Sequence, residues 1–386
     1  MTRRNWSVPE TKVVQRIRDR LDAEGTDVLA TVVDIEGNAY RRPGAKMLLD
    51  ADGDGVGSIT AGCLEDELVR VADEVRAAGE PRLVTYDLME GEDEEVWGLG
   101  VGCNGVIEVL LEPLTETYRP AVEAFGDGRD VAVVTVLDGG AGALERGDRA
   151  YYDPVEGTLS TPAGDAATWP ADALAGPAAA LAERGRADTV TVDGATLFVD
   201  GLSAPPELVV FGTGHDVGPV TELAAKNDFR VTVVGFRGAV DLAERFPAAE
   251  RTLTTSPGTL TEEIDLGADT YAVVMTHNFV DDRLTVEALL DASVPYVGLM
   301  GPRERFDQMR DAFAEEGRTF DGDDLSALYT PIGLDLGGGS PYQIAHSIVA
   351  EALAVANDRT PRHLKTREGP IHDRVDVDVD AGVPPQ

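Results

Sequence analysis

The sequence predicts an α/β protein of two domains, a mixed α+β domain followed by a domain built on a doubly wound parallel sheet. The length of 386 residues is too great for one ordinary hydrophobic core. After Ala204-Pro205-Pro206 strands and helices alternate strictly, which is typical of a parallel sheet covered on both faces. A glycine-rich turn also joins the first strand of this half to its first helix. We therefore expect domains at residues 1–203 and 207–358, and a tail at 359–386 that is disordered at its end.

Two helices in the first domain are predicted by apolar residues at helical spacing, at Pro9–Glu24 and Leu64–Ala78. The Ala-, Pro- and Gly-rich stretch Thr161–Pro177 predicts a loose excursion. Runs of β-branched and apolar residues between turn signals predict the strands. These strands lie at Val28–Ile35, Lys46–Leu49, a short segment reaching Ile59, Arg82–Asp87, Val106–Leu111, Asp130–Leu137, Ala150–Tyr152, Thr189–Val192 and Thr196–Val199.

The second domain is predicted to contain five parallel strands with helices between them and a closing helix at Pro341–Asn357. Beyond Thr360, the segment Val375–Asp380 alternates like a strand, but it is too acidic and too close to the end to be assigned as one. The predicted strands are Leu208–Phe211, Val231–Val234, Arg251–Leu253, Tyr271–Met275 and Pro295–Leu299.

The composition is strongly acidic, with 70 Asp and Glu against 33 Lys and Arg and a net charge of −37. Because the acids are spread over the whole chain and lysine is scarce, the pattern is typical of a halophile protein adapted to high intracellular salt. Such a surface repels nucleic acid and anionic lipid, so we expect neither as a partner. The start Met1–Trp6 has no apolar stretch behind it, which indicates a cytoplasmic protein. Two cysteines without a Cys-x-x-Cys pair predict neither a zinc site nor a disulfide framework.

The glycine-rich turn reads Gly212-Thr213-Gly214-His215 and follows an apolar strand directly, with a helix predicted to begin near Asp216. Glycines at such a turn let backbone N–H groups approach a pyrophosphate, and the helix N-terminus favours negative charge. The third glycine, Gly218, comes one place later than in the usual G-x-G-x-x-G pattern. This context predicts a Rossmann-type domain that binds a nucleotide-bearing ligand. The alternative is a glycine turn that only packs.

Two further positions bear on this ligand. Gly235 ends the second strand, where a dinucleotide site usually has an acid for the ribose 2′-hydroxyl, and Arg237 nearby either accepts a phosphate or faces solvent. His277 follows the fourth strand and should lie across from Gly212–Gly214, because strand order reverses between the first and fourth strands. The alternative for His277 is a hydrogen-bonded core histidine.

In the first domain, Arg41, Arg42 and Lys46 surround a Pro-Gly turn and predict an anion site, with a solvated basic loop as the alternative. Cys63 and Cys103 each adjoin glycine. A helix begins after Cys63 and favours its thiolate, but the acids that follow at once oppose that effect. Cys103 has no such acidic run, so it is the favoured reactive thiol; the alternative for both is a small buried hydrophobe.

Taken in order, several segments resemble the XdhC/CoxI family, the maturation factors of molybdenum hydroxylases such as xanthine dehydrogenase and carbon monoxide dehydrogenase. The resemblance runs from about Val28 to His372, apart from the loose middle. The segments that carry it are Arg42–Met47, Gly57–Glu65, Gly100–Gly105, Phe211–His215, Met275–Asn278, Gly298–Arg303, Pro331–Gly337, Ser340-Pro341, Ile344-Ala345, Ser347–Glu351 and Gly369–His372. The chain departs from the family pattern at Asn38-Ala39, Ala61, Asn104 and Gly235.

The resemblance implies binding of molybdenum cofactor, as molybdopterin or its dinucleotide form, help in its sulfuration, and insertion into an apo molybdenum hydroxylase. A cysteine desulfurase would be the second partner, and we expect a homodimer that acts as a cofactor-binding chaperone rather than a catalyst. We expect the cofactor to lie between the domains, with its phosphates in the Rossmann crevice and a cysteine near its metal. The cofactor-binding residues expected are Gly212, Thr213, Gly214, His215, Gly218, Arg237, His277, Arg42, Lys46, Cys63 and Cys103.

Two rival functions come from other classes. An NAD(P)-dependent oxidoreductase is disfavoured by Gly235 and by the lack of an obvious proton-relay pair. A nucleotide-sensing interaction module without catalysis is the other rival. Turnover of reduced nicotinamide would identify the first, and fluorescence of co-purified pterin would support cofactor delivery.

Overall fold

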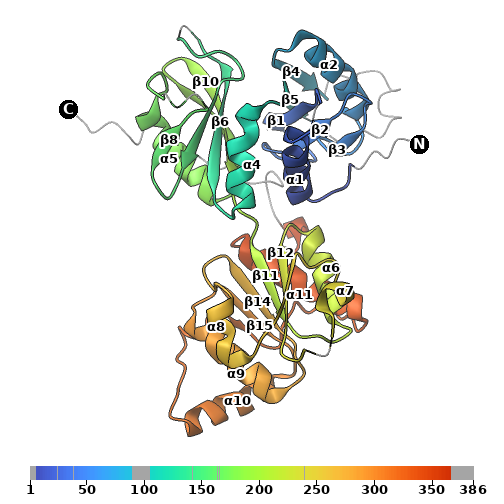
Figure 1. Cartoon of the computed structure of the whole chain (residues 1–386), viewed down its shortest axis with the longest axis vertical. Coiled ribbons are helices and arrows are strands. Elements are labelled where there is room, and N and C mark those ends of the chain that lie inside the picture. Colours follow the sequence, from blue (N-terminus) through green and yellow to red (C-terminus); the bar gives the residue numbers. More distant parts are fainter. Residues whose placement is uncertain are drawn as a thin grey trace, which may run out of the picture. The chain divides into compact units, whose positions relative to one another are not determined.

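The computed structural model describes residues 6–23, 25–37, 39–88, 105–140, 142–162, 164, 166–238 and 240–366. The chain divides into two compact units, shown in Figure 1. The first runs up to Ala204 and also takes in the described residues from Leu364 onward, which include the 3₁₀ turn η3 (Leu364–Thr366). The second spans Pro205–His363. The segment Val375–Asp380 lies outside the described residues.

The first unit begins with a five-stranded antiparallel sheet in the order β3-β2-β1-β5-β4. One face packs against the helix α2 (Glu65–Ala78), whose Leu68, Val71 and Val75 are buried among strand residues. This pattern follows from the apolar spacing on the helix and the β-branched residues on the strands. The strands are β1 (Val28–Gly37), β2 (Lys46–Leu49), β3 (Gly55–Gly57), β4 (Arg82–Asp87) and β5 (Gly105–Pro113).

A second antiparallel sheet follows in the same unit, in the order β8-β7-β6-β10-β9. The helix α5 (Ala171–Glu183) covers one of its faces. The prediction of a loose excursion over Thr161–Pro177 is therefore wrong for its second half. The alanines there favour a helix, and Leu174, Ala178 and Leu181 bury its apolar side despite the internal Pro177. The strands are β6 (Val131–Asp138), β7 (Arg149–Asp153), β8 (Thr158–Ser160), β9 (Ala187–Val192) and β10 (Ala195–Leu202).

The two sheets of the first unit share a core. One apolar cluster combines residues of α1 (Glu10–Leu21) and α4 (Arg119–Gly126) with residues of both sheets. The 3₁₀ turn η1 (Glu116–Tyr118) leads into α4 and buries Tyr118 in this cluster. The predicted N-terminal α+β domain is confirmed, and it consists of two packed antiparallel sheets with helices.

The second unit is a six-stranded parallel sheet in the order β13-β12-β11-β14-β15-β16, which confirms the predicted Rossmann-like fold. Helices cover both faces: α6 and α11 pack on one, α9 and α10 on the other. The strands are β11 (Glu207–Phe211), β12 (Arg230–Gly235), β13 (Arg251–Thr254), β14 (Thr270–Val274), β15 (Tyr296–Leu299) and β16 (Leu328–Tyr329). The helices are α6 (Val217–Lys226), α7 (Leu242–Arg245), η2 (Pro257–Thr259), α8 (Leu260–Glu263), α9 (Phe279–Asp291), α10 (Arg303–Glu315) and α11 (Pro341–Ala356).

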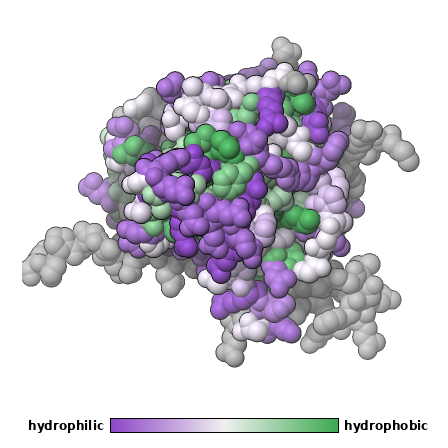
Figure 2. Space-filling model, turned by 90° about the horizontal axis from the view of Figure 1, so that it is seen from below, coloured by the Kyte–Doolittle hydropathy of each residue, from purple (hydrophilic) through white to green (hydrophobic). Residues whose placement is uncertain are grey.

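The surface reflects the acidic composition. Figure 2 shows a face on which hydrophilic residues predominate and hydrophobic residues occur in small, separated groups. Within the described ranges, no helix is both long enough and apolar enough to span a bilayer.

Candidate functional site

The strand order of the second unit reverses between β11 and β14. From β11 the sheet continues outward through β12 and β13, and from β14 it continues in the opposite direction through β15 and β16. In open parallel sheets, ligands bind at the carboxyl ends of the strands at such a point. The glycine turn after β11 and the segment after β14 meet there, as the sequence predicts. We call this meeting point of the two segments the crevice.

The glycine turn is shaped by close contacts. Gly212 has a φ of 154°, and a Cβ there would lie 2.5 Å from the carbonyl oxygen of Met275. A Cβ on Gly214 would lie 2.3 Å from a carboxylate oxygen of Asp216. Local packing therefore already requires glycine at 212, where the contact is with backbone, whereas a side chain at 214 would displace the Asp216 carboxylate. At Gly218, in α6, a Cβ would meet nothing within 4 Å, so this glycine is not needed for close helix–strand packing.

His277 lies across the crevice from this turn, as predicted. Its Nε2 is 2.9 Å from Oδ2 of Asp216, and its side chain is 57% exposed. The exposure excludes the alternative of a buried core histidine. Asp216 is the residue before α6, yet its side chain does not cap the helix and pairs with His277 instead.

The segment after β14 holds a buried carboxylate. Thr276 donates to Oδ1 of Asp282 from its backbone N–H at 3.1 Å and from its hydroxyl at 2.5 Å. Asp282 is 1% exposed, and Arg305 of α10 donates to its Oδ2 at 2.5 Å. Asn278 caps α9 by accepting from the N–H groups of Val280 and Asp281. These contacts fix the loop that carries His277, which has a φ of 60°.

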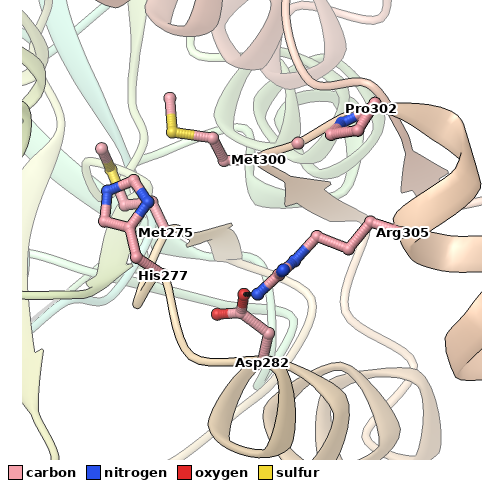
Figure 3. Close-up of a pocket in the computed structure, with 7 residues that line it drawn as sticks. Met275, His277, Asp282, Met300, Pro302 and Arg305 are labelled. Atoms are coloured by element: carbon pink, nitrogen blue, oxygen red, sulfur yellow. Dashed lines mark hydrogen bonds and ion pairs between the residues drawn. The ribbon is translucent and has the colours of Figure 1, made fainter.

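A pocket of about 230 Å³ opens beside the crevice, between the ends of β14 and β15. Figure 3 shows Arg305 reaching to Asp282, with His277 and Met300 facing the same space from other sides. Gly301 has a φ of 126°, and a Cβ there would lie 2.8 Å from Cδ of Arg305, so glycine leaves room for that side chain. The pocket is lined by Met275, His277, Asp282, Met300, Gly301, Pro302 and Arg305.

Gly235 and Arg237 differ in what they offer a ligand. A Cβ on Gly235 would lie 2.9 Å from the methyl carbon of Thr213, so the threonine fills the space that a longer side chain would need. Arg237 is 72% exposed and lies 3.5 Å from Asp281 at the start of α9. His215 is exposed beside the turn.

The cations expected to form an anion site in the first unit are not brought together. Lys46 is buried in β2, where its ammonium is 2.5 Å from Asp200 and donates to the carbonyl oxygen of Gly44 at 2.8 Å. Burial lowers the pKa of Lys46 and is the largest single influence, but Asp200 and Tyr118 together raise it by more, so the pKa lies above its usual value. Arg41 pairs with Glu10, and Arg42 is exposed. All four residues of β2 are buried, and Lys46 is one of them. The scarcity of lysine in the sequence suggests a binding role and gives no sign of this burial.

Cys63 is exposed at the start of α2, so it is not a small buried hydrophobe. The hydroxyl of Thr60 accepts from the N–H groups of Cys63 at 3.0 Å and Leu64 at 3.2 Å. The Glu65 side chain, fully buried, accepts from the N–H of Thr60 at 2.9 Å and that of Leu64 at 3.1 Å. The chain's own oxygens therefore take up the amides of Cys63 and Leu64, two of those near enough to stabilise a thiolate. Cys103 lies outside the described residues.

Sequence reasoning missed several polar groups that the structure places at these sites. Asp282 follows a second acid, Asp281, and nothing in the sequence distinguishes the fully buried carboxylate from the partly buried one. Arg305 comes shortly after the glycine-proline pair Gly301-Pro302, and that pair is the signal that could have drawn attention to it. Thr60 and Glu65 act through a local hydrogen bond and Asp216 through a long-range contact with His277, and no periodicity indicates either. In the part of the chain that the structure describes, no three Cys, His, Asp or Glu side chains form a group that could hold a metal ion.

These features define a protein with a nucleotide-type Rossmann domain that lacks the acid of an ordinary NAD site and follows an α+β unit. Two family models match the sequence, "XdhC and CoxI family" over residues 20–87 and "XdhC Rossmann domain" over residues 208–352. A Bacillus subtilis (strain 168) protein, named as a probable xanthine dehydrogenase subunit, is 30% identical over 342 residues, which cover 86% of this chain and 94% of that protein. The chain therefore belongs to the XdhC and CoxI family.

Two other similarities are consistent with this assignment. The uncharacterized protein YqeB of Escherichia coli (strain K12) is 28% identical over 179 residues, or 45% of this chain and 32% of that protein. A crystal structure described as a xanthine dehydrogenase from Bacillus halodurans has a TM-score of 0.72 and 26% identity. That match covers 91% of this chain and 96% of the other.

Proposed function

We propose that this protein is a maturation factor that binds molybdenum cofactor, assists its sulfuration and inserts it into a molybdenum hydroxylase of the xanthine dehydrogenase type. Membership of the family supports the general role, and two of the similar proteins carry the name xanthine dehydrogenase. The observation that carries the proposal is the crevice at the strand-order reversal, where His277 faces the glycine turn at Gly214. A cytoplasmic apo hydroxylase and a cysteine desulfurase are the proposed partners of a homodimer.

The residues of the crevice fit the phosphate end of such a cofactor. Gly218 leaves open space at the first turn of α6, whose N-terminus favours negative charge. Asp216 would repel a phosphate, but its carboxylate does not cap α6 and instead contacts Nε2 of His277 at 2.9 Å. Arg237 at the end of β12 adds an exposed cation. When bound, the cofactor would supply the metal centre that the hydroxylase uses, and this chain's residues would bind and orient it.

The rival function, an NAD(P)-dependent oxidoreductase, has the strand order in its favour. It lacks a carboxylate at the end of β12 for the ribose 2′-hydroxyl, and the Thr213 methyl group leaves no room for one. The chain would instead have to bind NADP, with the 2′-phosphate of the ribose contacting Arg237. The observations therefore favour the cofactor-delivery function.

The test is the pterin content of the purified full chain. We expect protein purified under nitrogen at high salt, from cells that make molybdenum cofactor, to contain pterin and molybdenum in equal amounts. The pterin is measured by its fluorescence after oxidation, and the metal by elemental analysis. Protein without either, but with turnover of NADH or NADPH, would replace this proposal with the oxidoreductase.

A further inference from the structure

The pocket between β14 and β15 places a hydrogen-bond donor and an acceptor side by side. Arg305 uses Nη2 to donate to Asp282, and a guanidinium carries five N–H donors in all. Asp282 accepts from Thr276 and Arg305, and a carboxylate has about four lone-pair positions. Both side chains line the pocket, so each has hydrogen-bonding capacity left for a ligand.

This pair does not suit a simple anion. A phosphate or sulfate that approached Arg305 would also approach the Asp282 carboxylate, which is 1% exposed and held in place by both Thr276 donors. The negative charges of the anion and of the buried Asp282 carboxylate would repel each other strongly at hydrogen-bonding distance from Arg305. A lactam edge, in which a carbonyl oxygen adjoins an N–H group, matches the pair without that repulsion. The oxygen accepts from Arg305 and the N–H donates to Asp282.

The remaining walls suit the faces of a flat ring. Met275, which is 1% exposed, and the more exposed Met300 line the pocket, and thioethers make favourable contacts with aromatic rings. Figure 3 shows Met300 facing the space that Arg305 and His277 border. The volume of about 230 Å³ is below the roughly 300–1,000 Å³ of pockets that enclose drug-sized ligands, so it suits one ring system rather than a whole dinucleotide.

We infer that this pocket binds the lactam edge of a planar heterocycle through Arg305 and Asp282, with the ring lying beside Met300 and Met275. With the function proposed above, on which this identification rests, the heterocycle is the pterin ring of molybdenum cofactor. The phosphates then occupy the neighbouring crevice. Purines such as guanine and xanthine carry the same lactam chemistry, so the test includes them.

The experiment is a fluorescence titration of the full chain with free pterin, and competition by guanosine 5′-monophosphate and by xanthine. Arg305→Lys keeps the charge beside Asp282 but removes the planar donor fork, and Met300→Phe fills the pocket. Arg303→Lys is the matched control, because Arg303 is exposed on the same helix and does not line the pocket. We expect each pocket variant to raise the pterin Kd about tenfold and the control to change it less than about twofold. Thermal unfolding checks that each variant is folded.

The outcomes separate the two proposals. Pterin affinity that is the same in folded Arg305→Lys and Met300→Phe as in the unmodified chain overturns the pocket assignment. Co-purified cofactor at unmodified levels in both variants also overturns it, and leaves the maturation function standing. Purine binding that is lost in both variants, with no pterin binding to the unmodified chain, supports the lactam pocket and counts against the maturation function.

Discussion

At the carboxyl end of β14, four consecutive residues perform four different tasks. Met275 lines the pocket, Thr276 holds the buried Asp282, His277 faces Asp216, and Asn278 caps α9. A substitution at any one of them therefore affects a different part of the site. The glycine turn is similar, because Gly212 and Gly214 affect both the local packing and the space open to a ligand.

Gly214 and Gly218 should respond oppositely to alanine. A Cβ at Gly214 would collide with Asp216 and approach Nε2 of His277 to 3.5 Å, so Gly214→Ala should disturb the contact between these two side chains and lower the pterin content of the purified protein. A Cβ at Gly218 meets nothing, and alanine is the better helix former by about 1 kcal/mol. Gly218→Ala should therefore raise the melting temperature slightly. Cofactor content in Gly214→Ala equal to that of the unmodified protein would refute this account of the turn.

The two cysteines should differ in the delivery assay. Cys63→Ser should leave the free energy of unfolding within about 0.5 kcal/mol, because the side chain is exposed. It should also leave hydroxylase activation intact, because the chain's own oxygens already occupy the amides around it. Cys103→Ser should abolish formation of active, sulfurated hydroxylase. Full delivery by the double serine variant would end any role for a cysteine.

At the scale of elements, the first unit is joined by ion pairs between its two sheets. Lys46 of β2 meets Asp200 of β10, and Arg149 of β7 meets Glu112 of β5 at 2.6 Å. All four side chains are buried, so each charge depends on its partner. These ion pairs fix the relative position of the two sheets. They also give Lys46, which the sequence suggests as a ligand for an anion, a structural role.

Lys46→Met should therefore cost stability rather than binding. Removal of the ammonium leaves Asp200 buried without its counter-ion, which destabilises proteins by about 3–5 kcal/mol. The pterin content per folded molecule should not change. The matched control is Lys12→Met, at an exposed lysine that contacts only Gln15 among the contacts described. Urea titration measures the difference, and loss of pterin from fully folded Lys46→Met protein would restore Lys46 as a ligand.

The parallel sheet and its glycine turn could be predicted from the sequence, because strand–helix alternation and glycine spacing are local patterns. The position of His277 followed from strand order. The helix at Ala171–Glu183 and the strand Leu328–Tyr329 could not be predicted, since one contains a proline and the other has two residues. The Arg305–Asp282 pair joins α10 to α9 and depends on tertiary packing, which no sequence periodicity reports.

At the scale of the whole molecule, a net charge of −37 is the dominant electrostatic feature. Many exposed arginines pair with carboxylates, as Arg70 does with Glu67 and Glu74 on α2. Exposed pairs contribute little to stability, whereas repulsion among the excess acids acts over the whole surface. Salt screens the attraction within the exposed ion pairs and the repulsion among the excess acids, and the repulsion contributes more to the free energy of folding.

Stability should consequently rise with salt. We expect the melting temperature to increase steadily between low and multimolar KCl, because screening relieves the self-repulsion of the folded state. The control is the same titration with an uncharged osmolyte at matched osmolality, which separates screening from general stabilisation. A melting temperature that is flat or falls with KCl would contradict the halophile interpretation of the composition.

Cofactor transfer tests the central claim most directly. Loaded full-length protein is mixed with an apo hydroxylase of the xanthine dehydrogenase type and a cysteine desulfurase with its substrate, and hydroxylase activity is followed together with the protein's pterin content. The account predicts that activity appears as pterin leaves this protein and that it requires the desulfurase. Activity that stays at the level obtained with heat-denatured loaded protein, or pterin that remains bound throughout, would contradict it.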